Sequence, residues 1–467
     1  MSAPAGGEVD PGVLRRARRS WYFYDWANSA YVTTTQTVLF APYLTVLARR
    51  AACPDGAGGA STPCTNDLSV LGLDVAPGSL ALYTVTVATL LSALLLPFVG
   101  AVADRSRHRH RLLAGFAWVG AGAATAMVAL SGDRWQLGVV LALVATMSLV
   151  CSLVVNDALL CDVSPPAERD AASSRGWAAG YLGGFLLLGV NLAAVSSPGT
   201  FGLDEEGAVR LSLASAGLWW GLFTVVPVLG LRRLPARPLT HVVPAARGVG
   251  APVRQLLVTV KGLRRYPQVL RFLLAYLVFN DGIQTVVFAS SVYGQEELGF
   301  SSAQLITTVL IVQAVAFGGA LLFGRLAVRF GAQRTVLGGL AGWILVVLGA
   351  FAMPRGAFTT WLALAVVIGV VLGGTQALAR SLYSRLVPVG AEAEYFSLYQ
   401  AGERGTSWLG TLVFGLVAQL TGSYRPALVA LLAFFVVGAV VLVRVDVEAG
   451  ERDARAGADP VGSTPES

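Results

Sequence analysis

Long apolar stretches alternate with short polar segments along nearly the whole chain. A membrane-spanning helix needs roughly 20 mostly apolar residues, and twelve stretches of this kind occur. Six of them precede the longest basic segment, residues 232–266, and six follow it. We therefore predict an all-α membrane protein of twelve transmembrane helices. The predicted spans begin near Tyr22, Gly78, Leu112, Trp135, Ser173, Leu211, Gln268, Ser302, Thr335, Thr360, Tyr395 and Arg425.

The spans form two equivalent halves. Residues 100–111 follow the second span and residues 324–334 follow the eighth, and both begin with a glycine that is five positions before an arginine. A repeat at about half the chain length predicts two six-helix halves arranged as parallel repeats. The predicted organisation is an N-terminal segment, a first half, a linker, a second half and a disordered acidic tail: residues 1–21, 22–231, 232–267, 268–445 and 446–467.

Basic residues gather in alternate connections between the spans. They are dense in residues 15–19, 105–111 and 232–271 and sparse in the intervening connections. Basic connections stay on the cytoplasmic side of a membrane, so we expect a multi-pass cell-membrane protein with both termini in the cytoplasm. The charged residues are only 13% of the chain, and the net charge of +7 lies in short clusters. We therefore expect no nucleic-acid partner.

The loop after the second span carries a recognisable motif. Residues 100–105 read Gly-Ala-Val-Ala-Asp-Arg, with further basic residues behind them, and residues 324–329 are a degraded copy in which Val328 replaces the acid. The first loop resembles the signature loop of the major facilitator superfamily, and the resemblance implies that fold. Such loops are thought to act as a cytoplasmic latch, which implies a gating role for Gly100, Asp104, Arg105, Arg109 and Arg329. A simple basic topology anchor is the alternative.

Longer motifs carry a narrower resemblance. Residues 24–31 read Tyr-Asp-Trp-Ala-Asn-Ser-Ala-Tyr, residues 279–285 Phe-Asn-Asp-Gly-Ile-Gln-Thr, and residues 373–381 Gly-Gly-Thr-Gln-Ala-Leu-Ala-Arg-Ser. These stretches resemble the vacuole-effluxer family, which is named for a yeast autophagy-related vacuolar protein implicated in releasing amino acids. The resemblance covers the chain from the first to the twelfth span. It implies efflux of a small polar solute, with an amino acid as a candidate.

Few ionisable side chains lie inside the predicted spans. A charge in the bilayer core costs about 3 kcal/mol or more, so it normally faces a bundle interior or an aqueous path. On the first helix the polar residues also share one face, which would be unsatisfied against lipid. We predict a substrate and proton pathway formed by Asp25, Asn28, Gln36, Asn156, Asp157, Asn280, Asp281, Gln284, Gln376, Arg380, Glu403 and Arg404. For the amide members, hydrogen bonding that only holds the bundle together is an equal alternative.

Depth separates the acids of this pathway. Asp281 lies about 13 residues into its span, or roughly 20 Å at the helical rise, whereas Asp25 and Asp157 lie nearer the cytoplasmic ends of theirs. We expect Asp281 to bind a proton or a substrate amine, and Asp25 and Asp157 to form a gate or ion pairs. A permanent ion pair of Asp281 with an arginine is the alternative. Glu403 and Arg404 are adjacent, point about 100° apart and each need another partner.

These features favour a secondary active transporter that works by alternating access and is linked to protons. A drug or lipid exporter and, from another class, a non-transporting membrane sensor or scaffold are the alternatives. No nucleophile and base motif or nucleotide-binding glycine loop stands out, so we expect no enzyme activity, no cofactor and no metal site. The expected partners are a small solute, protons and the bilayer, and the expected state is a monomer. A disulfide between Cys53 and Cys64 and two free thiols are equal alternatives.

Overall fold

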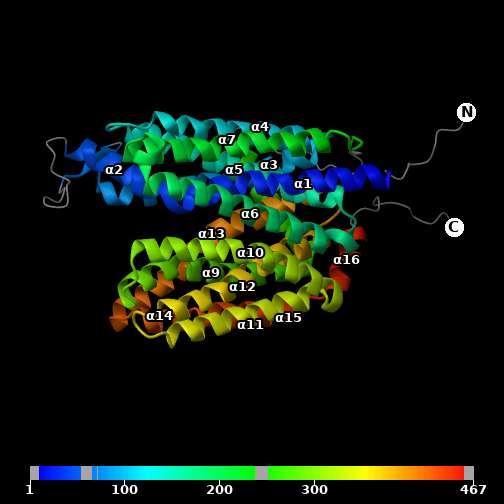
Figure 1. Cartoon of the computed structure of the whole chain (residues 1–467). Coiled ribbons are helices and arrows are strands. Elements are labelled where there is room, and N and C mark those ends of the chain that lie inside the picture. The colour runs from blue at the N-terminus through cyan, green and yellow to red at the C-terminus, as the bar shows by residue number, and fades with distance from the viewer. Residues whose placement is uncertain (1–9, 54–65, 71, 237–250, 457–467) are drawn as a thin grey trace, which may run out of the picture.

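The computed structural model describes residues 10–53, 66–70, 72–236 and 251–456. Long helices run side by side, with the first half above the second in Figure 1. The first half contains α1 (Pro11–Tyr31), its π-helical continuation η1 (Val32–Leu39), α2 (Phe40–Ala52), α3 (Leu80–Asp104), α4 (Arg109–Ala126), α5 (Trp135–Val163), α6 (Arg169–Ser196) and α7 (Glu205–Leu231). The second contains α9 (Pro267–Val292), its π-helical continuation η7 (Tyr293–Glu297), α10 (Ser302–Phe330), α11 (Ala332–Phe351), α12 (Phe358–Leu386), α13 (Glu392–Thr421), α14 (Tyr424–Ala430) and α15 (Leu432–Val443).

The shorter elements lie outside the main helices. Helix α8 (Ala251–Gly262) belongs to the linker, and α16 (Val447–Ala456) follows the last span. An antiparallel hairpin of β1 (Leu68–Val70) and β2 (Leu73–Val75) lies between α2 and α3, with Ser69 opposite Asp74. The 3-10 turns are Pro77–Ser79, Met127–Ala129, Pro166–Glu168, Pro198–Phe201 and Leu263–Arg265.

Ten helices within the described residues are long and apolar enough to cross a membrane. They correspond to ten of the twelve predicted spans. The other two predicted spans are α1 with its continuations and α13, which also pack within the bundle. These two helices are too polar to count among the ten, because the first turns of α1 contain the arginines of residues 15–19 and α13 contains Glu392, Glu394, Glu403 and Arg404. The predicted class of all-α membrane protein is confirmed.

Helix ends follow local sequence signals. Ser301 caps α10 in a capping box, in which its Oγ accepts from the N–H of Gln304 while its own N–H donates to Oε1 of Gln304. Helix α13 ends before Gly422, whose φ of 68° is a left-handed conformation that glycine adopts without steric cost. The first helix begins at Pro11, earlier than the predicted Tyr22, because Asp10 caps it and proline suits its first position.

The two halves meet along a seam of six helices. Helices α3, α5 and α6 of the first half pack against α10, α12 and α13 of the second. In Figure 1, α6 and α13 lie between the upper and lower bundles. The seam therefore brings together helices that carry half of the predicted pathway residues, namely those on α5, α12 and α13.

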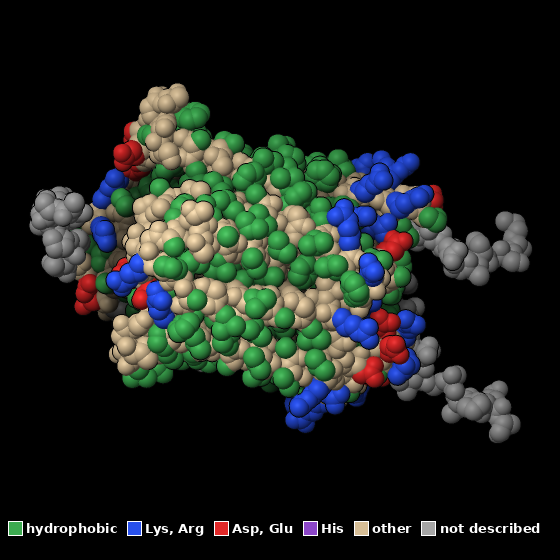
Figure 2. Space-filling model, turned by 60° about the horizontal axis from the view of Figure 1, so that its bottom comes forward, with side chains coloured by type: hydrophobic (Ala, Val, Ile, Leu, Met, Phe, Trp, Pro, Cys, Tyr) green, Lys and Arg blue, Asp and Glu red, His purple; other side chains and the backbone are tan. Residues whose placement is uncertain are grey.

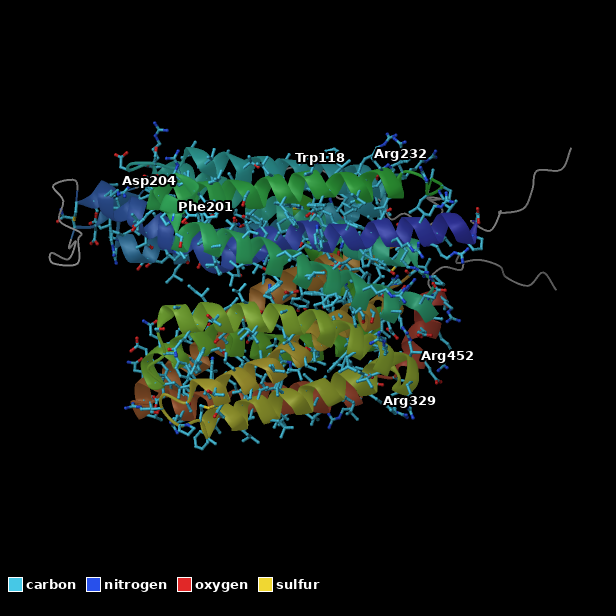
Figure 3. All side chains as sticks on the ribbon, viewed as in Figure 1. Trp118, Phe201, Asp204, Arg232, Arg329 and Arg452 are labelled. Atoms are coloured by element: carbon cyan, nitrogen blue, oxygen red, sulfur yellow. The ribbon has the colours of Figure 1, made fainter. Side chains whose placement is uncertain are left out.

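The molecule has two chemically different ends. We name the end where α1 begins and α16 lies the basic end, at the right of Figure 1. Lys and Arg side chains gather there in Figure 2, and a predominantly apolar surface lies between it and the opposite end. Figure 3 places Arg232, Arg329 and Arg452 at the basic end and Phe201 and Asp204 at the opposite end. This distribution matches the pattern of basic connections in the sequence.

The tail corrects one prediction. Residues from 446 onward were expected to be disordered, but α16 (Val447–Ala456) is helical and docked on the bundle. The N–H of Asp446 donates to Oε1 of Gln268 at 3.0 Å, and the N–H of Val389 donates to the carbonyl of Ala454 at 3.3 Å. The acidic composition indicated solvation, whereas these contacts with the second half offset the entropy lost on ordering.

Candidate functional site

A cavity of about 400 Å³ lies between the two halves. Its walls come from α1, η1, α5 and α6 of the first half and from α9, α10, α12 and α13 of the second. Along α12 the lining runs from Trp361, near the opposite end, to Arg380, nearer the basic end. Nine predicted pathway residues line it: Asp25, Asn28, Gln36, Asp157, Gln284, Gln376, Arg380, Glu403 and Arg404.

The polar stripe of α1 faces this cavity, as its periodicity predicts. Asp25, Asn28 and Ser29 lie on one face of α1, and Thr33 and Gln36 continue the stripe along η1. Neighbouring helices satisfy parts of it, since Gln36 donates to Oγ1 of Thr146 at 3.0 Å and Gln313 of the second half donates to Oγ1 of Thr33 at 2.8 Å. Sequence periodicity therefore identified a wall of the site.

Arg380 joins the two halves at the floor of the cavity. Its guanidinium lies 2.9 Å from Oδ2 of Asp25 and 3.3 Å from Oδ1 of Asp157. Only 3% of Arg380 is exposed, so these ion pairs are well shielded from water. The predicted ion-pair role of Asp25 and Asp157 matches this geometry.

Several side chains that the sequence did not single out hold Arg380 in place. The rings of Trp21 and Trp177 lie 4.9 Å and 5.4 Å from its guanidinium carbon, a cation–π arrangement. Its Nε donates to Oγ of Ser173 at 2.9 Å, and Gln400 donates to Oδ2 of Asp157 at 2.8 Å. No sequence pattern marks these side chains, because buried tryptophan and serine are also ordinary packing residues.

Asn156 and Asn280 support the cavity from behind its walls. Asn156 donates from Nδ2 to Oδ1 of Asp25 at 3.2 Å. Asn280 accepts a hydrogen bond at Oδ1 from Gln376 at 2.7 Å. Both residues are fully buried and neither lines the cavity. For these two amides the structure therefore matches the alternative of hydrogen bonding within the bundle.

On α13, Glu403 and Arg404 both line the cavity. The hydroxyl of Tyr276 donates to Oε2 of Glu403 at 2.9 Å, and Gln284 donates to Oε1 at 3.5 Å. Glu403 thus has two partners on α9. A partner other than Arg404 was expected, because adjacent residues of a helix point about 100° apart. Helix α13 thereby contributes one acid and one base to the cavity.

The predicted gating loop lies at the basic end, where it contacts the start of α13. Asp104 accepts hydrogen bonds from the N–H groups of Ala393 and Glu394 at 3.0 Å and 2.8 Å, which places its negative charge at the start of α13. Arg109 forms ion pairs with Asp104 and, at 3.0 Å, with Glu392. Asp104 and Arg109 therefore link the first half to the second.

Gly100, Arg105 and Arg329 have different surroundings. A Cβ on Gly100 would lie 2.5 Å from the carbonyl oxygen of Ala393, so only glycine permits this approach of α3 to α13. Arg105 donates to the carbonyl of Ala101 within its own half. Arg329, at the end of α10, lies over the ring of Phe330 at 5.3 Å. The first-half copy of the loop contacts α13, and the degraded copy lies against α6, where a Cβ on Gly324 would be 2.7 Å from the Cβ of Ser174.

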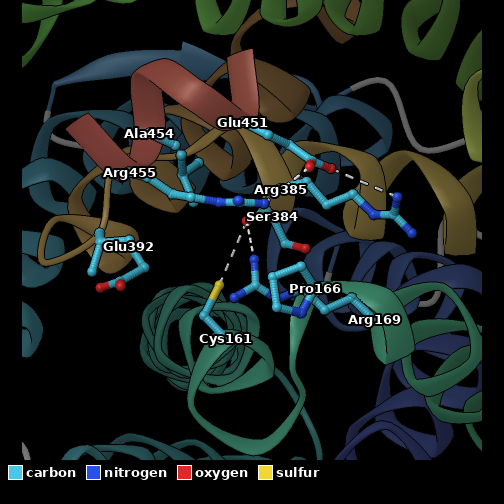
Figure 4. A pocket seen from close by; sticks show the side chains of 11 residues that line it. Cys161, Pro166, Arg169, Ser384, Arg385, Glu392, Glu451, Ala454 and Arg455 are labelled. Carbon is cyan, nitrogen blue, oxygen red and sulfur yellow. Dashed lines mark hydrogen bonds and ion pairs between the residues drawn. The ribbon is translucent and has the colours of Figure 1, made fainter. Parts of the chain in front are cut away.

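A second layer of contacts at the basic end was missed by the sequence interpretation. Arg385 of α12 pairs with Asp170 of α6 and lies 3.8 Å from Glu451 of α16. Arg169 of α6 donates to the carbonyl of Ser384 at 2.6 Å, a contact drawn in Figure 4. These charged residues lie at helix ends, where the sequence alone indicates only which side of the membrane they occupy. Tertiary pairing distinguishes them from simple anchors.

The cysteines and metal-binding side chains complete the survey of the site. Cys53 is disulfide-bonded, while the described Cys151 and Cys161 are free thiols. The predicted partner, Cys64, lies outside the described residues. Within the described parts of the chain, no group of three or more His, Cys, Asp or Glu side chains is placed to hold a metal ion.

Solved structures share this fold. The fucose:proton symporter FucP of E. coli superposes with a TM-score of 0.65 and 13% identity over 93% of this chain and 98% of that one. The human organic anion transporter MFSD10 gives a TM-score of 0.65 and 16% identity over 93% and 100%. An outward-facing bacterial homologue of ferroportin gives 0.64 and 14% over 92% and 98%. Together with the central cavity between two six-helix halves, this likeness shows the fold of the major facilitator superfamily.

Sequence comparison places the chain within that class. Residues 14–455 match the family model described as "Vacuole effluxer Atg22 like", and the chain belongs to this family. It is 30% identical to the uncharacterized MFS-type transporter YxiO of Bacillus subtilis, over 93% of this chain and 95% of the relative. It is 25% identical to autophagy-related protein 22-1 of Phaeosphaeria nodorum, over 98% and 94%. The predicted family is confirmed.

Proposed function

We propose that this transporter is a secondary active carrier that exports a small zwitterionic solute, such as an amino acid, in a proton-linked cycle. The observation that carries the proposal is the charge pattern of the cavity. Carboxylates of Asp25, Asp157 and Glu403 and guanidinium groups of Arg380 and Arg404 line one chamber. A zwitterion offers an ammonium to the first set and a carboxylate to the second.

The contacts across the seam support an alternating-access cycle. The inter-half ion pairs between described residues lie toward the basic end: Arg109 with Glu392, Arg380 with Asp25 and Asp157, and Arg385 with Asp170. The cavity continues from Arg380 toward Trp361 near the opposite end. We propose that this is a state closed at the basic end, and that these pairs separate when the carrier opens there. Interfaces of this kind switch between discrete arrangements.

Transport by the purified full-length protein in proteoliposomes tests the solute class. We expect exchange of a tritium-labelled mixture of the standard amino acids across the vesicle membrane, and accumulation when a pH gradient is imposed. A saturating solute should also stabilise the folded protein, by about 2.7 kcal/mol at 100 times its dissociation constant. Protein-free vesicles are the control. Export of apolar dyes without amino-acid exchange would instead support the drug-exporter alternative.

The disulfide supports a cell-membrane orientation with the basic end in the cytoplasm. Disulfides persist in oxidising compartments outside the cytosol, and Cys53 ends α2, which lies at the end of the molecule away from α16. The proposed orientation agrees with the cytoplasmic placement of basic segments. It places the opposite opening of the cavity outside the cell.

Thiol labelling tests this orientation. Intact cells treated with a membrane-impermeant reductant and then an impermeant maleimide should acquire label at Cys53. A Cys53→Ser variant should acquire label without reductant, because the substitution frees the thiol that was bonded to Cys53. Without reductant, the denatured protein should expose only the thiols of Cys151 and Cys161. Labelling that requires permeabilised cells would contradict the orientation, and a third thiol before reduction would contradict the disulfide.

A further inference from the structure

Asp281 lies near the middle of α9 but outside the solute cavity. Its side chain is 1% exposed, and its Oδ2 accepts a hydrogen bond from the backbone N–H of Gly410 on α13 at 2.8 Å. A Cβ on Gly410 would lie 2.1 Å from Oγ1 of Thr285, so only the missing side chain allows so close a contact. Asp281 is therefore enclosed between two helices of the second half.

Two buried oxygen atoms at this contact have no hydrogen-bond partner among the described residues. They are Oδ1 of Asp281 and Oγ1 of Thr285, whose residues are four apart on α9 and share one face of that helix. Folded proteins leave few buried polar atoms unpaired, so each such atom requires an explanation. A carboxylate oxygen is an acceptor, and a hydroxyl one turn away is a suitable neighbour for a bound proton.

No cationic side chain among the described residues pairs with Asp281. The alternative of a permanent Asp281–arginine pair is therefore wrong for this conformation. Helix α15 has no ionisable residue. The charged side chains of α9 and of helices α11, α12 and α13 around it lie at the basic end, are paired, or lie about 10 Å along the helix from the Gly410 contact. They are Arg271 on α9, Arg334 on α11, Arg380 and Arg385 on α12, and Glu392, Glu394, Glu403 and Arg404 on α13.

We infer that Asp281 is the proton-binding site of the carrier and that it is separate from the solute cavity. The inference rests on the proposed function and names the group that holds the coupled proton. A proton on Oδ1 converts an unpaired buried charge into a neutral carboxyl, which burial favours. A metal cation fits less well, because hard cations need about six oxygen ligands, and the described residues supply two unpartnered oxygens here.

Two helices connect the proton site to the cavity. Gln284, one turn along α9 from Asp281, lines the cavity and donates to Oε1 of Glu403. Helix α13 carries both Gly410, which contacts Asp281, and Glu403, which lines the cavity. A change in the charge of Asp281 alters the contact between α9 and α13 and thereby reaches Glu403. The proton and the solute therefore do not need to bind the same side chain.

Wild-type protein provides the first test, which is independent of any solute. Dicyclohexylcarbodiimide is an apolar reagent that modifies protonated carboxyl groups in apolar surroundings. We expect mass spectrometry of protein treated in membranes to find the adduct at Asp281, with more adduct in acidic than in alkaline buffer. An unmodified Asp281 across this range, with adduct at other buried carboxyls, would overturn the inference.

Coupling provides the second test. Asp281→Asn keeps the size of the side chain and mimics a permanently protonated carboxyl. A pH gradient of one unit drives up to about tenfold accumulation of solute for each coupled proton. We expect the variant to lose this accumulation while it still exchanges the labelled amino-acid mixture within about twofold of wild type. Asp74→Asn, on the exposed β2 strand, is the matched control and should keep both activities.

The outcomes separate the inference from the proposed function. An Asp281→Asn variant that still accumulates solute under a pH gradient overturns the inference alone. Accumulation that responds to a sodium gradient instead overturns both the inference and the proton-linked cycle of the proposed function. A folded variant that loses exchange as well as accumulation also overturns it, because the residue would then act on solute directly. Absence of amino-acid exchange by the wild-type protein overturns the proposed function, whereas the carbodiimide result still reports on Asp281.

Discussion

Replacing Arg380 with alanine is expected to abolish transport and to lower the free energy of unfolding by about 3–5 kcal/mol. The substitution leaves the carboxylates of Asp25 and Asp157 buried without their cation, and both are less than 10% exposed. It also removes the cation that lies between Trp21 and Trp177. Arg380→Lys should recover part of the stability but little transport, since an ammonium cannot reproduce the fork that reaches two carboxylates.

Thermal unfolding in detergent and transport in proteoliposomes measure the two effects. Arg452→Ala, an exposed change at the basic end, is the control and should match wild type in both assays. A double-mutant cycle with Asp25→Asn and Arg380→Gln should show a coupling energy of about 0.5–3 kcal/mol. Additive effects of the two substitutions would contradict a stabilising ion pair between the halves.

Gly100→Ala is expected to prevent closure at the basic end. The new Cβ would lie 2.5 Å from the carbonyl oxygen of Ala393 and 2.8 Å from Cα of Glu394. These are backbone atoms at the start of α13, so neither can move aside as a flexible side chain would. Overpacking costs about 1–3 kcal/mol, and a 1.4 kcal/mol change shifts a conformational equilibrium about tenfold. Transport should fall by about the same factor.

Cys161 reports the opening directly. Its thiol lies at the seam beside Ser384, within a small pocket that Figure 4 shows beneath α16. A maleimide added from the basic end should therefore modify Cys161 about tenfold faster in the Gly100→Ala variant. Gly115→Ala is the matched control, because a Cβ at Gly115 of α4 would meet nothing within 4 Å. Equal rates in Gly100→Ala and wild type would show that α3 and α13 tolerate the methyl group.

The polar residues of the pathway could be named from the sequence because polar groups are rare in apolar helices. Nine of the twelve line the cavity. The periodicity of α1 also gave the correct face. Periodicity is less decisive for α9, where Asp281, Gln284 and Thr285 are spaced three and four residues apart. Gln284 and Thr285 lie about 100° apart on either side of Asp281, and the structure turns only Gln284 toward the cavity.

Partners were harder to predict than positions. The sequence marked Arg380 as a pathway residue, but its contacts with Asp25 and Asp157 join positions far apart in the chain. Arg385 with Asp170 and Arg109 with Glu392 were missed as pairs for the same reason. Hydrophobic periodicity contains no information about which helix faces which. It also leaves the rotation of each helix within the bundle undetermined.

The sequence by itself determined the membrane class, the two-half organisation and the identity of most buried polar residues. These three features follow from the cost of placing polar groups in a bilayer. That cost acts on each helix separately, so the order of residues along the chain reveals it. Only the tertiary structure decided that Arg380 joins the halves, that α16 docks at the basic end, and that Asp281 faces α13. These facts depend on distances between separate helices, which packing fixes and which no single helix encodes.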